Sequence, residues 1–554
     1  MSAPPHRSVD VAIVGAGTAG LAAYHAAVAR TSRVVVIEQG PPGTMCARVG
    51  CMPSKLLLAA AEIAHSARHA AVFGVECSFR VDGGAVMARL RRERDRFVEL
   101  SAAEAQSIPA GDLIHGSARF ISPHLLAVDG QSIEARAVVI ATGSAPSVPP
   151  DLRALGDGVA VSDDVFEWTT LPESLAVFGS GPLGIELGQA FQRLGVRVRI
   201  FGRGGAVGQL TDPAVRAAAL TALRSEVALE PDSHVLEVHR DGEGVAVHFE
   251  DPGGRVRVET FARALVAAGR HPALGGVGLE NAGLSLDPDG FPLVDRGTMQ
   301  CGRAAVFIAG DASDGNPVLH EAVDEGRIAG DNAARYPQVV PAPRRSRLQI
   351  TFCEPQLAVV GPGFEKLSEH GDVVVGEVSF VNQGRSRIMG RNRGLGHVYA
   401  DPASGRFLGA EMAGPAAEHL GHLLAWAHQQ ELGVDRMLEM PIYHPVVEEG
   451  LRTALRDASA KRHATGSLLA PKRKARLDRR SAMRKVSTET KAVEGEGSYT
   501  AARAYHAGAA KAQKAGHSRE LGEKASAALD GPEGASLREA ERIGKTGNPR
   551  RAHK

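Results

Sequence analysis

Two cysteines five positions apart, Cys46 and Cys51, are the residues of this 554-residue chain with the clearest potential for chemistry. They stand in the segment Cys46-Ala47-Arg48-Val49-Gly50-Cys51-Met52-Pro53-Ser54-Lys55. A close pair of thiols can cycle between a dithiol and a disulfide, and a strained, accessible disulfide is the labile kind that serves catalysis. We therefore predict a redox-active pair.

The spacing constrains the backbone between the two thiols. Five residues of continuous α-helix rise about 7.5 Å, whereas a disulfide usually needs a Cα separation of roughly 4.4–6.8 Å. The pair can close only where the start of the helix is irregular, and Gly50 and Pro53 are placed to allow that.

We expect the other cysteines, Cys77, Cys301 and Cys353, to be unrelated buried thiols. No second Cys/His pair at zinc-like spacing accompanies the motif, so we predict no metal site.

A βαβ unit directly before the cysteines must position them. Residues 9–14 predict an apolar strand, residues 21–30 predict a helix, and residues 33–37 predict a second strand that ends at Glu38. This order is typical of the mononucleotide-binding unit. Glu38 suits the two hydroxyls of an adenosine ribose.

The loop of this unit is Gly15-Ala16-Gly17-Thr18-Ala19-Gly20. Gly15 permits the tight turn, Gly17 lets the backbone approach a pyrophosphate, and Gly20 permits close packing of helix on strand. The free N–H groups of the helix N-terminus then face the phosphates.

The same pattern returns near residue 174. A strand at 174–178 leads into Gly179-Ser180-Gly181-Pro182-Leu183-Gly184, followed by a helix to Leu194 and a strand at 196–201. A single glycine motif is a weak signal, but two in matching frames indicate that one chain binds two dinucleotides. Two further strands, at 137–140 and 305–309, end in short runs expected to bring backbone to a ligand: Ala141-Thr142-Gly143 and Gly310-Asp311.

Beyond about residue 347 the pattern changes. Alternating stretches at 357–360 and 372–380 and helical material at 418–431 indicate an α+β domain. After Asp457 large apolar residues become rare, and residues 461–554 carry a net charge of +12 against −11 for residues 1–460. We predict a basic tail that is mostly disordered.

Composition excludes several classes of protein. Five cysteines are too few for a disulfide scaffold, no signal segment opens the chain, and no apolar run is long enough to span a membrane. Secreted and membrane-inserted proteins are thereby excluded, and we expect a cytoplasmic enzyme.

At these motifs the chain resembles the class I pyridine nucleotide-disulfide oxidoreductases. The resemblance covers about residues 10–457 and follows the family order. The motifs are the first glycine loop, CxxxxC with Pro53-Ser54-Lys55, Ala141-Thr142-Gly143, the second glycine loop, Gly269-Arg270-His271-Pro272, Gly310-Asp311, and His444-Pro445-Val446-Val447-Glu448-Glu449.

The resemblance implies roles for individual residues. FAD would lie along Gly15, Gly17, Gly20 and Glu38 and past residues 141–143, with Asp311 on its ribityl or phosphate portion. Cys51 would face the flavin, and Cys46 would exchange with the substrate.

The same resemblance implies that Lys55 approaches the flavin and pairs with Glu186. NAD or NADP would bind at Gly179, Gly181 and Gly184. His444 would be the acid–base, oriented by Glu449, with Glu448 as the competing partner. In the family that pair serves the other subunit's disulfide, which implies a homodimer.

The nicotinamide preference and the substrate are less tightly specified. An NAD-preferring unit ends its second strand with an acid, but here Gly202 occupies that position and Arg203 follows, which favours a 2′-phosphate and hence NADPH. Among the family's activities we expect a dihydrolipoamide dehydrogenase acting on a small, sometimes protein-bound, dithiol. An NADPH-dependent disulfide reductase, similar to glutathione reductase, is the alternative.

The basic segment at 471–480 could bind nucleic acid, anionic lipid or an acidic partner, but no aromatic stacking platform accompanies it. We favour the hypothesis that the tail serves to keep the protein soluble. The rival hypothesis is that the protein is a flavoprotein that acts mainly as a binding module through this tail.

The predicted fold class is α/β. Its parts are an FAD-binding domain at 1–150 that resumes at 276–346, an NAD(P)-binding domain at 151–275, a dimerisation domain at 347–458 and the tail at 459–554.

Overall fold

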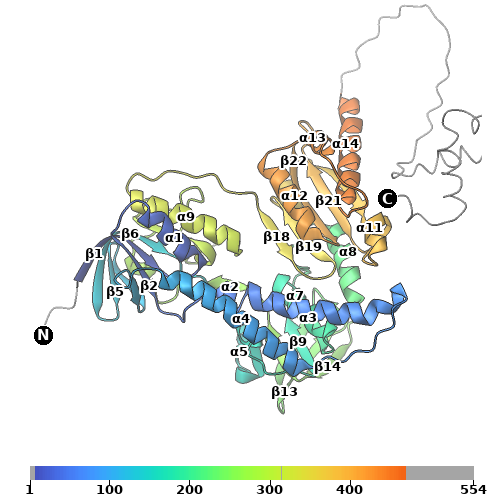
Figure 1. Ribbon diagram of the computed structural model, residues 1–554, viewed down its shortest axis with the longest axis horizontal. Helices are drawn as coiled ribbons and strands as arrows, with labels where there is room; N and C mark the ends of the chain where they lie inside the picture. The colour runs from blue at the N-terminus through green and yellow to red at the C-terminus, as the bar shows by residue number, and fades with distance from the viewer. Residues whose placement is uncertain (1–5, 314, 470–554) are drawn as a thin grey trace, which may run out of the picture. The chain divides into compact units, whose positions relative to one another are not determined.

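The computed structural model describes residues 6–313 and 315–469, and it begins with the predicted βαβ unit (Figure 1). Strand β1 (His6–Val14) leads through the glycine loop into α1 (Thr18–Val28) and then into β2 (Val34–Glu38). Strand β1 starts three residues before the predicted strand because His6 and its neighbours continue the pairing with β6 (Gln131–Ile140). Helix α1 begins directly after Gly17, inside the glycine motif.

The first sheet has a parallel half and an antiparallel half. Parallel strands run in the order β3-β2-β1-β6, and β17 pairs with β6 on its other side, so the chain returns to this sheet after leaving it. The first half of β6 instead pairs antiparallel with β5, which pairs with β4. The bounds not yet given are β3 (Leu113–His115), β4 (Ala118–Ser122), β5 (Leu125–Val128) and β17 (Val306–Ile308).

Helices α1 and α9 (Leu319–Arg335) lie side by side against this sheet (Figure 1). Two glycines of α9 face the backbone of α1. A Cβ on Gly326 would lie 2.2 Å from the Ala19 carbonyl oxygen, and one on Gly330 would lie 2.1 Å from the Ala23 carbonyl oxygen. The helices can approach this closely only because both positions lack a side chain.

We expect Gly330→Ala to lower the free energy of unfolding by about 1–3 kcal/mol, the usual cost of overpacking. Alanine has the higher helix propensity by about 1 kcal/mol, but here its Cβ would clash with backbone of α1 that other packing holds in place. Thermal denaturation of the two proteins measures the difference. Gly384→Ala is the matched control, since a Cβ there meets nothing within 4 Å; equal losses for both variants would contradict the packing argument.

The second sheet is entirely parallel and runs in the order β11-β10-β9-β15-β8. Helix α7 (Pro182–Arg193) follows β9 as α1 follows β1, and its inner face packs with α3 (Cys51–His69) in one apolar core. The strands are β8 (Val159–Val161), β9 (Ser174–Phe178), β10 (Arg197–Phe201), β11 (Ala228–Glu230) and β15 (Arg263–Val266).

A three-stranded antiparallel sheet is inserted before β15. It consists of β12 (His234–Asp241), β13 (Gly244–Glu250) and β14 (Val256–Phe261). Short strands β7 (Ser144–Pro146) and β16 (Arg270–Pro272) pair with each other. The remaining α-helices up to residue 313 are α2 (Met45–Arg48), α4 (Gly83–Gln106), α5 (Pro150–Arg153), α6 (Ser162–Val165) and α8 (Pro213–Arg224).

The predicted α+β domain is built on a five-stranded antiparallel sheet in the order β18-β19-β22-β21-β20. Its elements are β18 (Leu348–Thr351), β19 (Gln356–Val360), α10 (Phe364–His370), β20 (Val374–Ser379), α11 (Gly384–Ile388), β21 (Leu395–Ala400), β22 (Phe407–Gly414), α12 (Ala417–Gln429), α13 (Val434–Leu438) and α14 (Glu449–Leu469).

Helix α14 continues past residue 458, where we expected the domain to end. Ala458 is fully buried, Lys461 donates to the Val375 carbonyl at 2.9 Å, and Arg462 pairs with Asp435 at 2.7 Å. These contacts tie the additional helical turns to the domain. The predicted tail from residue 470 onward lies outside the described residues.

Candidate active site

The first glycine loop packs tightly against a neighbouring strand end. Gly15 has a φ of +108°, and a Cβ there would lie 2.3 Å from the Ala141 carbonyl oxygen. A Cβ on Gly20 would lie 1.9 Å from the Gly15 carbonyl oxygen. Gly17, which caps the N-terminus of α1, has open space beside its Cα. The loop thus leaves room for an anionic ligand at the backbone N–H groups of the helix.

The second loop repeats this construction. Gly179 has a φ of +125°, and a Cβ there would lie 2.2 Å from the Ala267 carbonyl oxygen. A Cβ on Gly184 would lie 2.0 Å from the Gly179 carbonyl oxygen, whereas Gly181 is open. The chain therefore contains two turns of the same geometry, each with open space at a helix N-terminus.

A cavity of about 290 Å³ lies beside the first loop. The Glu38 carboxylate projects into it and accepts hydrogen bonds from the backbone N–H groups of Ala16 and Gly40, both at 2.6 Å. These bonds fix the carboxylate at the end of β2, where an adenosine ribose would lie. The lining includes the predicted residues Gly15, Gly17, Glu38, Ala141, Thr142 and Gly143.

The cysteine pair lies across a helix break, as its spacing predicts. Cys46 is in the short helix α2, which Thr44 caps by accepting a hydrogen bond from the Ala47 N–H, and Cys51 is the first residue of α3. Gly50, with φ of −120° and ψ of −118°, separates the two helices. Both thiols are free in the structure.

The pKa values of the two thiols are shifted in opposite directions. The Cys46 thiol donates a hydrogen bond to Cys51, which raises the pKa of Cys46, as does its burial. Accepting that bond, together with the positive charge of Lys55, lowers the pKa of Cys51 to about 7 against the opposing effect of burial. In the reduced protein Cys51 is therefore the thiol that ionises first, near neutral pH, whereas Cys46 stays protonated.

The pKa of about 7 predicts how the reduced protein titrates. Since the thiolate is the deprotonated form, its population rises as pH increases through 7 and falls below it. Ultraviolet absorbance of the thiolate in the reduced apoprotein measures this midpoint. We expect Lys55→Met to move it to higher pH, because the variant lacks the ammonium that favours the anion; an unchanged midpoint would contradict the assignment.

Lys55 is held by a buried carboxylate. Its ammonium lies 2.7 Å from Glu186 Oε2 and 4.4 Å from the centre of the Phe352 ring. Glu186, on α7, is 4% exposed, and it also accepts hydrogen bonds from the Ser54 hydroxyl at 3.2 Å and from the Phe352 N–H at 2.8 Å. The pairing of Lys55 with Glu186 expected from the resemblance is thus present, and it joins the cysteine helix to the second glycine unit.

A second cavity, of about 380 Å³, brings most of these groups together. It adjoins the first cavity, because Gly17, Val49, Ala141 and Gly143 line both. Continuous lining thus runs from Glu38 to the cysteine pair. The predicted residues in its wall are Cys46, Cys51, Lys55, Glu186, Gly310 and Asp311.

Arg270 belongs to a motif that the sequence analysis named, but it was not itself predicted to be a site residue. Its guanidinium donates to the Ser144 carbonyl and hydroxyl oxygens, both at 2.9 Å, to Asp163 at 3.0 Å and to the Met45 sulfur at 2.8 Å. Ser144 in turn donates to Asp311 at 2.8 Å. Arg270 therefore fixes the wall shared by the cavities, and only the motif Gly269-Arg270-His271-Pro272 could have signalled it.

A third cavity, of about 360 Å³, lies beside the second glycine loop. Gly181, Gly269 and Asp311 line it together with Leu183. Its position at the N-terminus of α7 suits a second dinucleotide.

The strand that follows this loop ends differently from β2. A Cβ on Gly202 would lie 2.3 Å from the Ser180 hydroxyl and 2.6 Å from the Pro231 carbonyl oxygen, so this backbone has no room for an acidic side chain. Arg203 is exposed. Within residues 6–313 and 315–469 no hydrogen bond or ion pair engages its guanidinium.

His444 and Glu449 form the predicted pair. His444 Nδ1 lies 2.9 Å from Glu449 Oε1, and Glu449 Oε2 accepts from the Val446 N–H at 3.2 Å. The predicted pairing of His444 with Glu449 is therefore present. The His444 side chain is 61% exposed and lines none of the three cavities described above.

The other cysteines lie apart from the site. Cys301 and Cys353 are buried as expected, and burial raises the pKa of both thiols. Cys77 is exposed, so the expectation that it is buried was wrong. It lies in an irregular segment after α3 that carries no apolar periodicity.

Comparison with known families explains this arrangement. Residues 9–326 match the pyridine nucleotide-disulphide oxidoreductase model, and residues 348–455 match the dimerisation domain of the same family. The chain belongs to this family. It is accordingly an FAD-dependent oxidoreductase that works with NAD or NADP.

Curated members of the family match this chain over nearly their own full length. The chain is 28% identical to the dihydrolipoyl dehydrogenase of Rhizobium etli, over 81% of this chain and 98% of that one. It is 30% identical to the dihydrolipoyl dehydrogenase of Thermus scotoductus, over 81% and 97%. It is also 30% identical to the mercuric reductase of Streptomyces lividans, over 81% and 96%.

Solved structures share the fold. The HOCl-induced flavoprotein disulfide reductase RclA of Escherichia coli matches with a TM-score of 0.68 and 24% identity, over 81% of this chain and 99% of that one. LpdA of Mycobacterium tuberculosis matches with a TM-score of 0.70 and 24% identity, over 81% and 99%.

The residues of this oxidoreductase fit FAD. The Thr142 hydroxyl is buried and has no hydrogen-bond partner within the described residues, so a bound ligand can satisfy it. Gly17 leaves open space at the helix N-terminus. In the part of the chain that the structure describes, no helix has the length and apolar character needed to cross a bilayer.

Proposed function

We propose that this oxidoreductase is a dihydrolipoamide dehydrogenase that passes electrons from a dithiol substrate to NAD(P) through Cys46 and Cys51. The observation that carries the proposal is the asymmetric thiol pair. Cys51 has its pKa lowered to about 7 in a cavity that also contains residues of both glycine units, whereas the Cys46 thiol is its hydrogen-bond donor.

The first half of the reaction is an exchange between the substrate and the Cys46–Cys51 disulfide. A substrate thiolate attacks the Cys46 sulfur, and Cys51 leaves as the thiolate. The second substrate thiolate attacks the substrate sulfur bound to Cys46, which closes the substrate disulfide and releases Cys46. Both electrons of the substrate then reside on the enzyme dithiol.

His444 is the residue that transfers the protons in this exchange. It accepts the proton of the first substrate thiol before attack, releases it to solvent, and then transfers the proton of the second thiol to the leaving Cys46 sulfur. Glu449 holds its Nδ1 and favours the imidazolium that forms. Since His444 lines none of the cavities around Cys46 in its own chain, we propose that the pair acts on the cysteines of a second subunit. The match of residues 348–455 to a dimerisation domain supports this homodimer.

The remaining residues bind and orient. FAD would be held by Gly15, Gly17, Gly20, Glu38, Ala141, Thr142, Gly143, Gly310 and Asp311. When bound, FAD supplies two-electron transfer between a thiolate and a nicotinamide. Lys55, fixed by Glu186, favours the Cys51 thiolate, and the second dinucleotide would lie along Gly179, Gly181, Gly184 and Gly269.

The relatives include both dihydrolipoyl dehydrogenases and mercuric reductases, and the cysteine content of the sequence favours lipoamide over Hg²⁺. Several curated relatives carry the name dihydrolipoyl dehydrogenase. Residues 354–554 contain no cysteine, whereas mercuric and large thioredoxin reductases are expected to carry an additional pair after the dimerisation domain.

Steady-state turnover on a matched panel tests the substrate. The pairs are dihydrolipoamide with NAD⁺ or NADP⁺, and glutathione disulfide or Hg²⁺ with NADH or NADPH. We expect kcat/KM for dihydrolipoamide to exceed the others by at least about tenfold, a difference of about 1.4 kcal/mol. Faster reduction of glutathione disulfide or Hg²⁺ would overturn this substrate.

An NADPH-dependent disulfide reductase is the second candidate, and Gly202 with Arg203 favours it. Arg203 is exposed and its guanidinium has no protein partner among the described residues. It lies next to a position too small for an acid, so it can pair with a 2′-phosphate.

We expect Arg203→Ala to raise KM for NADPH by about 5–50-fold and to leave KM for NADH unchanged. The reason is the loss of one charge-assisted contact of roughly 1–2.5 kcal/mol, which only NADPH makes. Equal effects on both nucleotides would contradict this role.

A further inference from the structure

Three potential metal ligands gather on the β12–β13 hairpin. The strands pair antiparallel, and Glu237 stands directly opposite His248. His239, two residues after Glu237 on β12, points to the same face because side chains alternate along a strand. The pairing register shifts between Val235 and Glu237, and the shifted register is the one that places Glu237 opposite His248. The register alone therefore brings two imidazoles and one carboxylate together.

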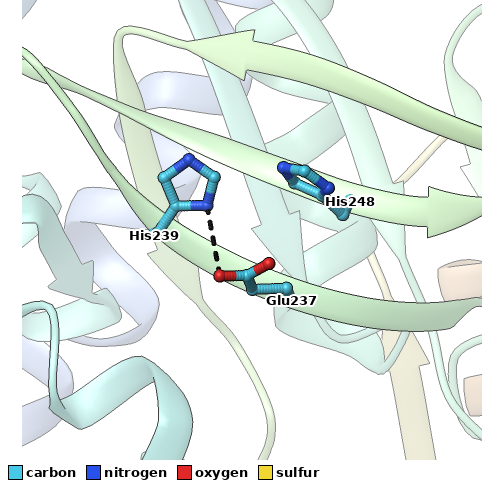
Figure 2. A group of neighbouring side chains, drawn as sticks. All are labelled: Glu237, His239 and His248. Carbon is cyan, nitrogen blue, oxygen red and sulfur yellow. Dashed lines mark ion pairs between the residues drawn. The ribbon is translucent and has the colours of Figure 1, made fainter.

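The ligand atoms are close to a coordinating arrangement. One atom from each of Glu237, His239 and His248 lies within 4.8 Å of the other two, and His239 Nδ1 is 3.7 Å from Glu237 Oε1 (Figure 2). Metal–ligand bonds of about 2.1 Å in a tetrahedron separate neighbouring ligand atoms by about 3.4 Å. Small rotations of these exposed and partly buried side chains would close the remaining gap.

One of these atoms lacks a hydrogen bond. His239 Nδ1 is buried and has no hydrogen-bond partner within the described residues. A buried polar atom without a partner is costly, and a bound cation would satisfy it. The Glu237 side chain, 63% exposed, leaves the group open to solvent on its other side.

The hairpin that carries the ligands is anchored on its opposite face. Val245, Val247 and Phe249 alternate with His248 along β13 and are 0%, 0% and 2% exposed. They belong to an apolar cluster with Phe178 and Phe201 of the parallel sheet. The ligands therefore stand on a fixed scaffold, as a binding site requires.

We propose that Glu237, His239 and His248 bind a divalent cation of the zinc type, with water in the open coordination positions. Imidazole nitrogen and carboxylate oxygen suit Zn²⁺, and three protein ligands leave a position for solvent. This departs from the prediction of no metal site, which rested on cysteine and histidine spacing near Cys46. None of the three residues lines the cavities around the glycine loops, so the site does not depend on the proposed function.

The test is calorimetric titration of the flavin-loaded full chain with Zn²⁺ at about pH 7.5, because metal binding requires deprotonated ligands. Cys46→Ser and Cys51→Ser are present throughout, because the dithiol would otherwise compete for zinc. We expect one Zn²⁺ per chain at this site, with His239→Gln and His248→Gln each weakening it by at least about tenfold. Mg²⁺, which prefers oxygen ligands, should not compete.

His234→Gln is the matched control. His234 lies on the same strand, but it pairs with Glu250 at 2.9 Å outside the group. It should leave zinc affinity unchanged. An unchanged isotherm in both His239→Gln and His248→Gln, or an equal loss in His234→Gln, would overturn the site. Flavin content and thermal denaturation verify that each variant is folded.

Discussion

We expect Cys51→Ser to lower kcat with any dithiol or disulfide substrate by at least about 10³-fold, since a hydroxyl can neither form the disulfide nor act as the thiolate. The variant should still bind FAD, because Cys51 contributes no part of either glycine loop. Steady-state turnover together with flavin content separates loss of chemistry from loss of cofactor.

Cys77→Ser is the control for this substitution. Cys77 is an exposed thiol outside the site, so its removal should leave turnover unchanged. Turnover of Cys51→Ser close to that of the unmodified enzyme would mean that electrons do not pass through this pair.

His444→Gln is expected to have the second largest effect. Loss of a positioned acid–base usually costs about 10²–10⁴-fold in rate, and glutamine keeps the polarity but cannot take up the proton. We expect a loss of this size in kcat with lipoamide or its dithiol. Glu449→Gln should cost about tenfold or more, because the histidine loses the negative charge of the carboxylate at 2.9 Å, whereas Glu448→Gln should cost little.

Mixed dimers test which subunit the histidine serves. A heterodimer of one Cys51→Ser subunit and one His444→Gln subunit contains one intact site if His444 acts across the interface, and none if it acts within its own chain. We expect the mixture to regain turnover that neither parent shows. Absence of regained turnover in verified heterodimers would contradict action across the interface.

The sequence predicts the positions of the glycine loops and cysteines well because local backbone constraints fix them. Gly15 and Gly179 require positive φ, and Gly20 and Gly184 face backbone at contact distance, so residue type reveals geometry at these positions. The helix break at Gly50 likewise follows from the length of a disulfide. The strand at 174–178 matches β9 residue for residue.

Features that depend on tertiary contacts are less visible in the sequence. Helix α14 extends to Leu469 through contacts with Val375 and Asp435, which are distant in the chain. The structural role of Arg270 emerges only where Met45, Ser144 and Asp163 meet.

The Glu237, His239 and His248 group shows the same limit. Its members are close only because β12 pairs with β13 in one particular register. A shift of one residue would move the two strands' side chains to opposite faces. Local spacing in the sequence therefore does not reveal the cluster.

The measurement that tests the central claim most directly is the absorbance spectrum of the holoenzyme after anaerobic addition of one equivalent of dihydrolipoamide. A Cys51 thiolate against the flavin predicts a long-wavelength charge-transfer band that persists in Cys46→Ser without reductant and is absent from Cys51→Ser. A protein that retains no flavin, or a band that survives in Cys51→Ser and disappears in Cys46→Ser, would contradict the account.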